Sequence, residues 1–361
     1  MVIKSKIYLR GKEFKRLRLL AIFLIVLSVA GTWFVWATTV SSNINSAKRH
    51  FGVVIQNDTS DLSKLFDLGG TVLYSGRSLI SSGATASRQT WNNFYDHLDL
   101  TKFYPSIKAV AYLSVINSTQ IQSMTNYLNT QQLAKSSAFK VYSAPGTSSN
   151  KTLAVVTYIA PSSVNQNFIG YDVFSNPLIA SALTSAAKQD TPALAAQKLT
   201  PLNGSSLSST LMVALPVYNT AVKIGPVQAS SGSTPIGYIA ALINANTLFN
   251  TIFKPITAYG KVGVTIKSDN KTIYSLPYSY KGRQITKTVE VKVANRTLSV
   301  FFNTTSDFGI NTISKIAPYS VLVRGLFFTG MLILTFYFAI SVKLIKEKYK
   351  INPDSKKQHN S

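Results

Sequence analysis

Two long apolar segments give the clearest pattern along the chain. Residues 19–40 contain no charged side chain over 22 positions, and residues 325–342 contain none over 18. A helix needs about 20 apolar residues to cross the hydrocarbon core of a bilayer. The first segment exceeds the roughly 7 to 15 apolar residues of a cleavable signal peptide, so we interpret it as an anchor. The pattern predicts membrane helices at residues 19–40 and 318–342.

The region between the two segments alternates between helical and strand periodicity. Apolar residues recur at helical intervals over residues 41–81, which predicts a long helix that the Gly69-Gly70 pair could kink or break. Shorter helices are predicted at residues 87–100, 119–128 and 177–187 and around Phe253. Strands are predicted at residues 107–116, 154–159, 168–174, 210–218, 237–243, 262–267, 288–293 and 297–303. This mixture predicts an α+β fold with antiparallel hairpins.

Basic residues flank both apolar segments on the side away from the central region. Seven Lys and Arg precede residue 19, and the tail at residues 343–361 is rich in Lys. Such residues stay on the cytoplasmic side of a membrane. We therefore expect both termini in the cytoplasm, the central region outside the cell, and the chain in the plasma membrane in contact with the lipid bilayer. Both tails are too short for a catalytic or signalling domain.

The composition narrows the function of the central region. The whole chain has a formal net charge of +24, of which about +13 belongs to the central region. The basic residues are spread along the sequence and form no nucleic-acid-binding motif, so we expect no nucleic-acid partner. There is no cysteine, and the three histidines have no ligand spacing. We therefore predict no disulfide, no metal, no cofactor and no catalytic site.

Four groups of residues in the central region give a more specific indication. The first is Trp91-Asn92-Asn93-Phe94 with Leu98, followed by Tyr104-Pro105-Ser106-Ile107-Lys108-Ala109-Val110-Ala111-Tyr112. The second is Val156-Thr157-Tyr158-Ile159-Ala160-Pro161 with Gly170-Tyr171-Asp172-Val173 and Asn176-Pro177. The third is Pro192-Ala193-Leu194 with Leu215-Pro216-Val217-Tyr218, and the fourth is residues 289–308 around Asn295-Arg296-Thr297-Leu298. In this order they resemble the CHASE domain, the extracellular sensor of cytokinin receptors and of many microbial signalling proteins. The resemblance covers residues 70–310 and implies a long helix followed by two PAS-like subdomains.

The resemblance also implies ligand-binding positions. In plant members an aspartate binds the purine of a cytokinin and a leucine contributes a main-chain contact; these positions correspond to Asp172 and Leu194. Asp172 has a second interpretation as a structural residue that caps a helix or pairs with a lysine. A threonine of the plant receptors corresponds to Ala214, which argues against cytokinin as the ligand. Possible lining residues, with a core role as the alternative, are Tyr112, Tyr158 and Tyr171.

These features predict a membrane-anchored, non-enzymatic sensor that binds a small extracellular molecule and informs a separate cytoplasmic or membrane protein. The alternative is a cationic surface or envelope protein that binds a polymer or a neighbouring complex. A homodimer is compatible with the family, although the membrane segments offer only the small pair Ser28/Thr32 as a packing signal. The expected organisation is a basic tail (1–18), a membrane helix (19–40), a helical stalk (41–86), a membrane-distal PAS-like subdomain (87–230), a membrane-proximal one (231–317), a second membrane helix (318–342) and a basic tail (343–361).

Overall fold

The chain forms two compact units. The computed structural model describes residues 2–82, 87–131, 138–144, 151–196, 210–218, 234–260, 262–278 and 283–351. One unit consists of residues 1–51 and 306–361, and the other consists of residues 52–305. Helix α1 (Val2–Ser81) contributes to both units. Each unit is described below by itself.

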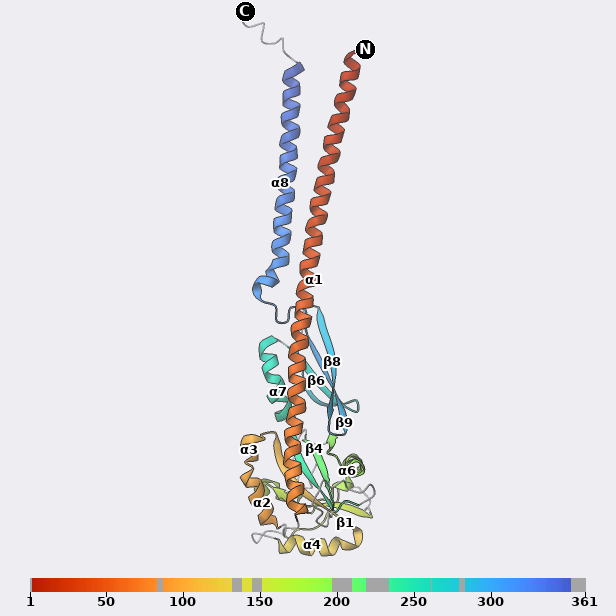
Figure 1. The fold of residues 1–361 in the computed structure, drawn as a ribbon, viewed down its shortest axis with the longest axis vertical. Helices are drawn as coiled ribbons and strands as arrows, with labels where there is room; N and C mark the ends of the chain where they lie inside the picture. Colours follow the sequence, from red (N-terminus) through yellow and green to blue (C-terminus); the bar gives the residue numbers. More distant parts are fainter. Residues whose placement is uncertain are drawn as a thin grey trace, which may run out of the picture. The chain divides into compact units, whose positions relative to one another are not determined.

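The first unit contains the two apolar segments. The amino-terminal part of α1 and helix α8 (Thr312–Ile351) are both long and apolar enough to cross a membrane (Figure 1). The hydroxyl oxygens of Ser28 and Thr329 lie 2.9 Å apart. Gly325 has no room for a Cβ atom because the side chain of Thr32 occupies that space. Small residues allow two helix backbones to approach closely in this way, so the Ser28/Thr32 pair packs against α8 of its own chain.

The long helix predicted over residues 41–81 is the outer part of α1. The helix passes through Gly69 and Gly70 without a break. Its side chains Leu62, Val72 and Leu73 are buried. Burial of this apolar stripe offsets the helix-weakening effect of two glycines, which is about 1 kcal/mol for each of them.

The first sheet of the second unit has five antiparallel strands in the order β2-β1-β5-β4-β3. The strands are β1 (Ile107–Asn117), β2 (Thr152–Ala160), β3 (Ala193–Ala196), β4 (Thr210–Val217) and β5 (Gly237–Asn244). The predicted subdomain boundary at residues 230/231 falls outside the described residues. It would assign β5 to the second subdomain, but β5 is the central strand of the first sheet because its backbone pairs with both β1 and β4.

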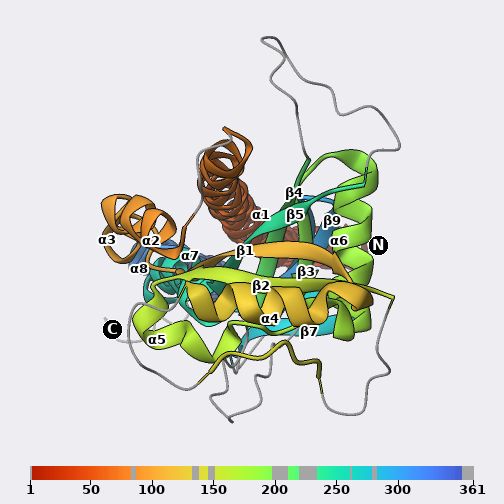
Figure 2. The ribbon, with the colours of Figure 1, turned by 90° about the horizontal axis from the view of Figure 1, so that it is seen from below.

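The two faces of this sheet are covered by different helices. The α6 face, which includes Ala111, Leu113 and Val156, packs against α4 (Ile121–Thr130) and α6 (Pro177–Gln189). The α2 face consists of the alternate side chains, such as Tyr112 and Tyr158, and it packs against α2 (Arg88–His97) and α1. Figure 2 shows α1 and α4 on opposite sides of β1 and β2.

Local signals explain where these helices begin. The Ser87 side chain accepts a hydrogen bond from the Thr90 backbone at the start of α2. The Asn176 side chain accepts from two backbone N–H groups at the start of α6, which has Pro177 in its first turn. The predicted helices are therefore confirmed at their capped ends. Two short elements accompany them, α3 (Leu100–Phe103) after α2 and the 3-10 turn η1 (Ser118–Gln120) before α4.

The second sheet has four antiparallel strands in the order β7-β6-β9-β8. They are β6 (Gly263–Ser268), β7 (Lys271–Leu276), β8 (Gln284–Val293) and β9 (Arg296–Thr305). Helix α7 (Ala245–Gly260) packs Phe249 and Phe253 against Tyr274 and Phe302. The long helix and the two antiparallel sheets confirm the predicted α+β fold. The sequence prediction missed the short strands β3 and β7.

The strand predicted at residues 168–174 is wrong. This segment contains the 3-10 turns η2 (Gln166–Phe168) and η3 (Val173–Ser175), after a short helix α5 (Ser162–Asn165). Gly170 has a φ of 86°, and a Cβ atom there would collide with the carbonyl oxygen of Lys140. The side chain of Asp172 then accepts from Phe174 N and turns the chain into η3. A left-handed glycine and a side-chain cap thus interrupt an apolar run that resembles a strand.

Candidate functional site

The five residues predicted to bind a ligand lie in two different environments. Tyr171 belongs to the core of the α6 face, and Asp172 is next to it in the chain. Tyr112 and Tyr158 face each other in register on β1 and β2, on the α2 face. Leu194 alternates with two residues of the α6-face core and therefore points to the opposite side of β3. The structure brings four of the residues together in two pairs, leaves Leu194 apart, and does not form one site from all five.

Asp172 is held by the backbone around it. Its carboxylate is 1% exposed and accepts hydrogen bonds from the backbone N–H groups of Ala154 and Phe174, each at 3.0 Å. Ser143 Oγ donates a longer bond of 3.4 Å to the other carboxylate oxygen. Burial raises the pKa of Asp172, and these hydrogen bonds partly oppose that rise. The geometry corresponds to the structural interpretation of this residue, since Asp172 pins β2 to the turn η3.

The space beside Tyr171 is small. A cavity of about 10 Å³ lies among apolar side chains of the α6 face, including Leu113, Phe168 and Met212. That volume is about what one water molecule needs, whereas ligand pockets usually measure about 300–1,000 Å³. Ala214 lies on the same face and is 1% exposed, so its methyl group fills the position where the plant receptors have a threonine.

The main-chain contact predicted for Leu194 is already made inside the chain. The backbone N–H of Leu194 donates to Oδ1 of Asn295 at 2.9 Å. Asn295 lies in the turn between β8 and β9, and its Nδ2 donates to Ser185 Oγ of α6 at 3.1 Å. The turn of the second sheet is thus fastened to β3 and α6 of the first subdomain through a single side chain.

Tyr112 and Tyr158 belong to an aromatic cluster on the α2 face. Their rings stack at 5.9 Å between centroids, and the ring of Trp91 lies 6.3 Å from Tyr112 and 6.0 Å from Tyr158. Tyr95 lies 4.7 Å from Trp91. The hydroxyl of Tyr158 is hydrogen-bonded to that of Tyr127 in α4. Burial raises the pKa values of Tyr95, Tyr112 and Tyr158, which keeps these phenols neutral donors.

Helix α2 contains four buried polar atoms that lack a hydrogen-bond partner within the described part of the chain. One of them, Asn92 Oδ1, is an acceptor, and the other three are donors. The donors are Arg88 Nε, Trp91 Nε1 and Tyr95 Oη, spaced so that they share one helical face. All three residues are at most 5% exposed. Most buried polar groups in proteins are paired, so three such donors on one face make this face a candidate site for a polar ligand group.

Arg88 is the residue that the sequence prediction missed. Its guanidinium lies over the ring of Phe139, 4.7 Å from the centroid, and Nη2 donates to Leu128 O at 3.5 Å. No acidic side chain that the structure describes lies within ion-pair distance of it. A basic residue in the first turn of a helix is usually exposed. The available signal was its spacing, because Arg88 precedes Trp91 by three positions and Tyr95 by seven on the apolar face.

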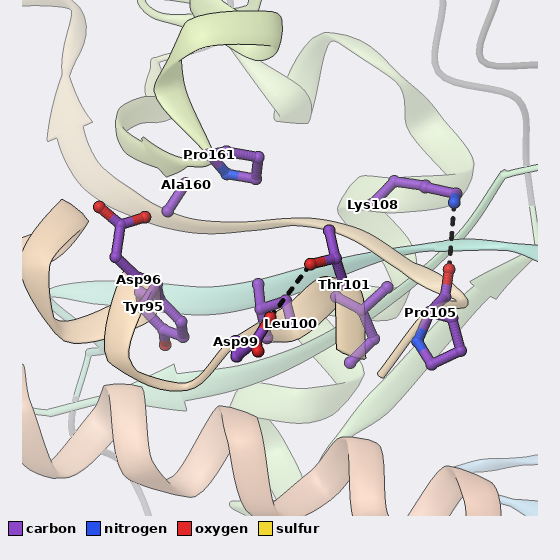
Figure 3. A pocket seen from close by; sticks show the side chains of 10 residues that line it. Tyr95, Asp96, Asp99, Leu100, Thr101, Pro105, Lys108, Ala160 and Pro161 are labelled. Atoms are coloured by element: carbon purple, nitrogen blue, oxygen red, sulfur yellow. Dashed lines mark hydrogen bonds between the residues drawn. The ribbon is translucent and has the colours of Figure 1, made fainter. Parts of the chain in front are cut away.

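A cleft of about 520 Å³ opens beside Tyr95 (Figure 3). Asp96 and Asp99 lie on the helical side of this cleft, and Ala160 and Pro161 at the end of β2 lie opposite them. Thr101 Oγ1 donates to Asp99 at 3.1 Å, and Lys108 Nζ donates to the carbonyl of Pro105 at 3.0 Å. The volume is in the range of small-molecule pockets. The cleft therefore meets the aromatic cluster at one residue, Tyr95.

Comparison with known protein families decides what kind of domain holds these features. The profile of the CHASE domain matches residues 84–272, which is more than half of the 361-residue chain. The chain belongs to the CHASE domain family. The match includes both faces of the first sheet, α2 and the cleft. Together with the two apolar helices, it identifies an extracellular sensory module of a membrane-anchored protein.

Solved structures show more distant similarity. An extracellular ligand-binding receptor from Desulfohalobium retbaense DSM5692 has 11% sequence identity and a TM-score of 0.45, with 71% of this chain and 40% of that chain covered. The periplasmic sensory domain of the Campylobacter jejuni chemoreceptor Tlp1 has 9% identity and a TM-score of 0.35, with 77% and 94% covered. The chain thus spans less than half the length of the first of these proteins. No curated protein matches the sequence.

Proposed function

We propose that this CHASE domain binds a small extracellular molecule on the α2 face of the first sheet and reports its presence to a separate protein through α1 and α8. The basic residues beside the apolar segments support a cytoplasmic location for both termini. The chain acts in this proposal as a receptor and catalyses no reaction.

The observation that supports this site is the row of unpaired donors at Arg88, Trp91 and Tyr95. These donors are embedded among aromatic rings, and the adjoining cleft has the volume of a ligand pocket. By contrast, Asp172 and Leu194 already have internal partners. The Tyr112/Tyr158 half of the predicted set therefore has the stronger support.

Two contacts suggest how occupancy could reach the membrane helices. Gly76 of α1 lies directly against the hydroxyl of Tyr95, so a shift of α2 pushes on α1. Asn295 joins the first subdomain to the β8–β9 hairpin. A ligand biases such an arrangement only if it binds one of two states more tightly.

A binding screen tests the first part of the proposal. The full-length protein in nanodiscs is heated with pools of small molecules of several chemical classes, and its melting temperature is recorded. A ligand present at 100 times its Kd adds about 2.7 kcal/mol to the free energy of unfolding. The alternative function, a cationic surface protein, predicts instead that no small molecule shifts the melting temperature and that heparin binds in a salt-sensitive manner.

A crosslinking experiment tests the relay. The chain contains no cysteine, so the double variant Ser28→Cys/Thr329→Cys has one unique pair at positions whose hydroxyl oxygens lie 2.9 Å apart. We expect the rate of disulfide formation to change when a ligand from the screen is added. An unchanged rate, with binding intact, would contradict transmission through these helices.

A further inference from the structure

The strongest unexplained feature of the α2 face is the buried positive charge of Arg88. A guanidinium stays charged at every physiological pH. The residue is 5% exposed, and burial lowers the pKa of Arg88. A guanidinium nevertheless keeps its proton in proteins. A buried charge is normally paired with an opposite charge. Arg88 has no such partner among the described residues.

The contacts that Arg88 does make leave its binding edge unused. Phe139 covers one flat side of the guanidinium. At the edge, Nε has no acceptor among the residues that the structure describes, and Nη2 makes a long bond of 3.5 Å to Leu128 O. Two neighbouring N–H groups of a guanidinium match the two oxygens of a carboxylate. The edge that would hold a carboxylate is therefore buried but lacks a strong acceptor among the described residues, while Phe139 covers the flat side.

We infer that the ligand of the α2 face bears a carboxylate, that this group pairs with Arg88, and that an apolar or aromatic body lies against Trp91 and Tyr158. This inference rests on the proposed function and assigns a chemical class to its ligand. Trp91 Nε1 lies one helical turn from Arg88 and supplies a further donor. A single guanidinium matches one negative charge, whereas a phosphate dianion is usually held by several cations.

The acids nearest in sequence do not replace the ligand. Asp96 and Asp99 line the cleft and lie eight and eleven residues beyond Arg88, which is about 12 Å along the helix for Asp96. The guanidinium edge is covered in this structure, so a carboxylate has to move part of that cover to reach it. Such a displacement gives the ligand different affinities for two arrangements of α2, which is what a sensor requires.

The test uses matched pairs of probes on the full-length protein in nanodiscs. Phenylacetate is compared with phenylacetamide, and indole-3-acetate with indole-3-acetamide, while inorganic phosphate and adenine serve as probes of other classes. We expect the carboxylates to raise the melting temperature and the amides to have little effect. Arg88→Met should weaken carboxylate binding at least about 100-fold, and Arg88→Lys about 10-fold, because lysine keeps the charge but loses the two-point geometry.

Lys140 provides the matched control. It is an exposed cation next to Phe139, and Lys140→Met removes the same charge from the surface. We expect this variant to bind the carboxylates like the wild type. Equal losses in Lys140→Met and Arg88→Met would mean that only the general positive field matters, which would overturn the inference.

The stability of the unliganded variant gives a second readout. Replacement of an unpaired buried charge by a hydrophobic side chain should leave the melting temperature unchanged or raise it. If Arg88→Met melts well below the wild type, Arg88 has a structural role and the inference is wrong. If adenine or phosphate binds and the carboxylates do not, the carboxylate is wrong but the sensor function stands; if no probe or pooled compound binds, both are contradicted.

Discussion

The two faces of the first sheet differ in whether their buried polar groups have hydrogen-bond partners. On the α6 face, the one buried carboxylate, Asp172, accepts hydrogen bonds from the backbone on both sides of it. On the α2 face, Arg88, Trp91 and Tyr95 are buried with donors that lack acceptors among the described residues. The α6 face is complete without a ligand, whereas the α2 face is not.

This difference in hydrogen bonding suggests that one face of the sheet serves stability and the other serves function. A satisfied polar group in a closed apolar core helps to fix a single structure. Unsatisfied buried donors reduce stability, and proteins retain such groups mainly where they act. In the proposed function, this contrast gives the α6 face a role in folding and the α2 face a role in recognition. The predictions below test each side of that assignment.

The largest effect is expected at Asp172. Asp172→Ala leaves the buried N–H groups of Ala154 and Phe174 without an acceptor and should lower the free energy of unfolding by about 3 kcal/mol. Asp172→Asn is the control, because Oδ1 of asparagine can still accept both bonds; it should cost less than about 1 kcal/mol. Chemical denaturation of the full-length protein measures both. Equal losses in the two variants would contradict the hydrogen-bond explanation.

The same residue predicts a pH dependence. Burial raises the pKa of Asp172 above the ordinary value of 3.8 for an aspartate, so the folded protein binds this proton more tightly than the unfolded chain does. Its contribution to stability is therefore fully present below pH 3.8 and is lost as the pH rises through the raised pKa of the folded state. The wild type should gain stability relative to Asp172→Asn as the pH falls through this window. A constant difference in unfolding free energy across the window would contradict the raised pKa.

Much of this fold follows from local sequence patterns. The apolar segments predict the membrane helices of α1 and α8, and the caps Ser87 and Asn176 predict the beginnings of α2 and α6. The hydrophobic pattern predicted a strand around Gly170 and was wrong there. The backbone of this segment is shaped by contact with the carbonyl oxygen of Lys140, thirty residues away in the chain. The position of β5 between β1 and β4 depends on pairing between distant strands, which no local pattern contains.

The site was predictable only in part. Tyr112 and Tyr158 follow from the family resemblance and do lie together, but the same reasoning assigned Asp172 and Leu194 to a site whose hydrogen bonds are already made. Arg88 was not predicted as a site residue, because the sequence gives its charge but not its burial. Whether a charged residue has a partner is a property of the folded molecule, and this property distinguishes the α2 face.

An intermediate effect is expected at Asn295, which connects β3 and α6 to the second sheet. Asn295→Ala removes the bonds to Leu194 N and Ser185 Oγ and should cost about 1–2 kcal/mol in the free energy of unfolding. The neighbouring variant Ala294→Gly is the control. Ala294 has a φ of 52°, so glycine there should stabilise the same turn by up to about 1 kcal/mol. Loss of stability in both variants would indicate that the turn conformation matters and the Asn295 side chain does not.

The smallest effect has the opposite sign and tests the α2 face directly. Tyr95→Phe removes a buried hydroxyl that has no hydrogen-bond partner in the described structure, so the unliganded protein should gain up to about 1 kcal/mol in unfolding free energy. Tyr218→Phe is the matched control, since the Tyr218 hydroxyl donates to Ala187 O at 2.6 Å and its removal should cost about 1 kcal/mol. Thermal or chemical unfolding of the full-length protein measures both. If Tyr95→Phe is destabilised as much as Tyr218→Phe, the hydroxyl of Tyr95 has a partner in solution, and the α2 face is as complete without a ligand as the α6 face.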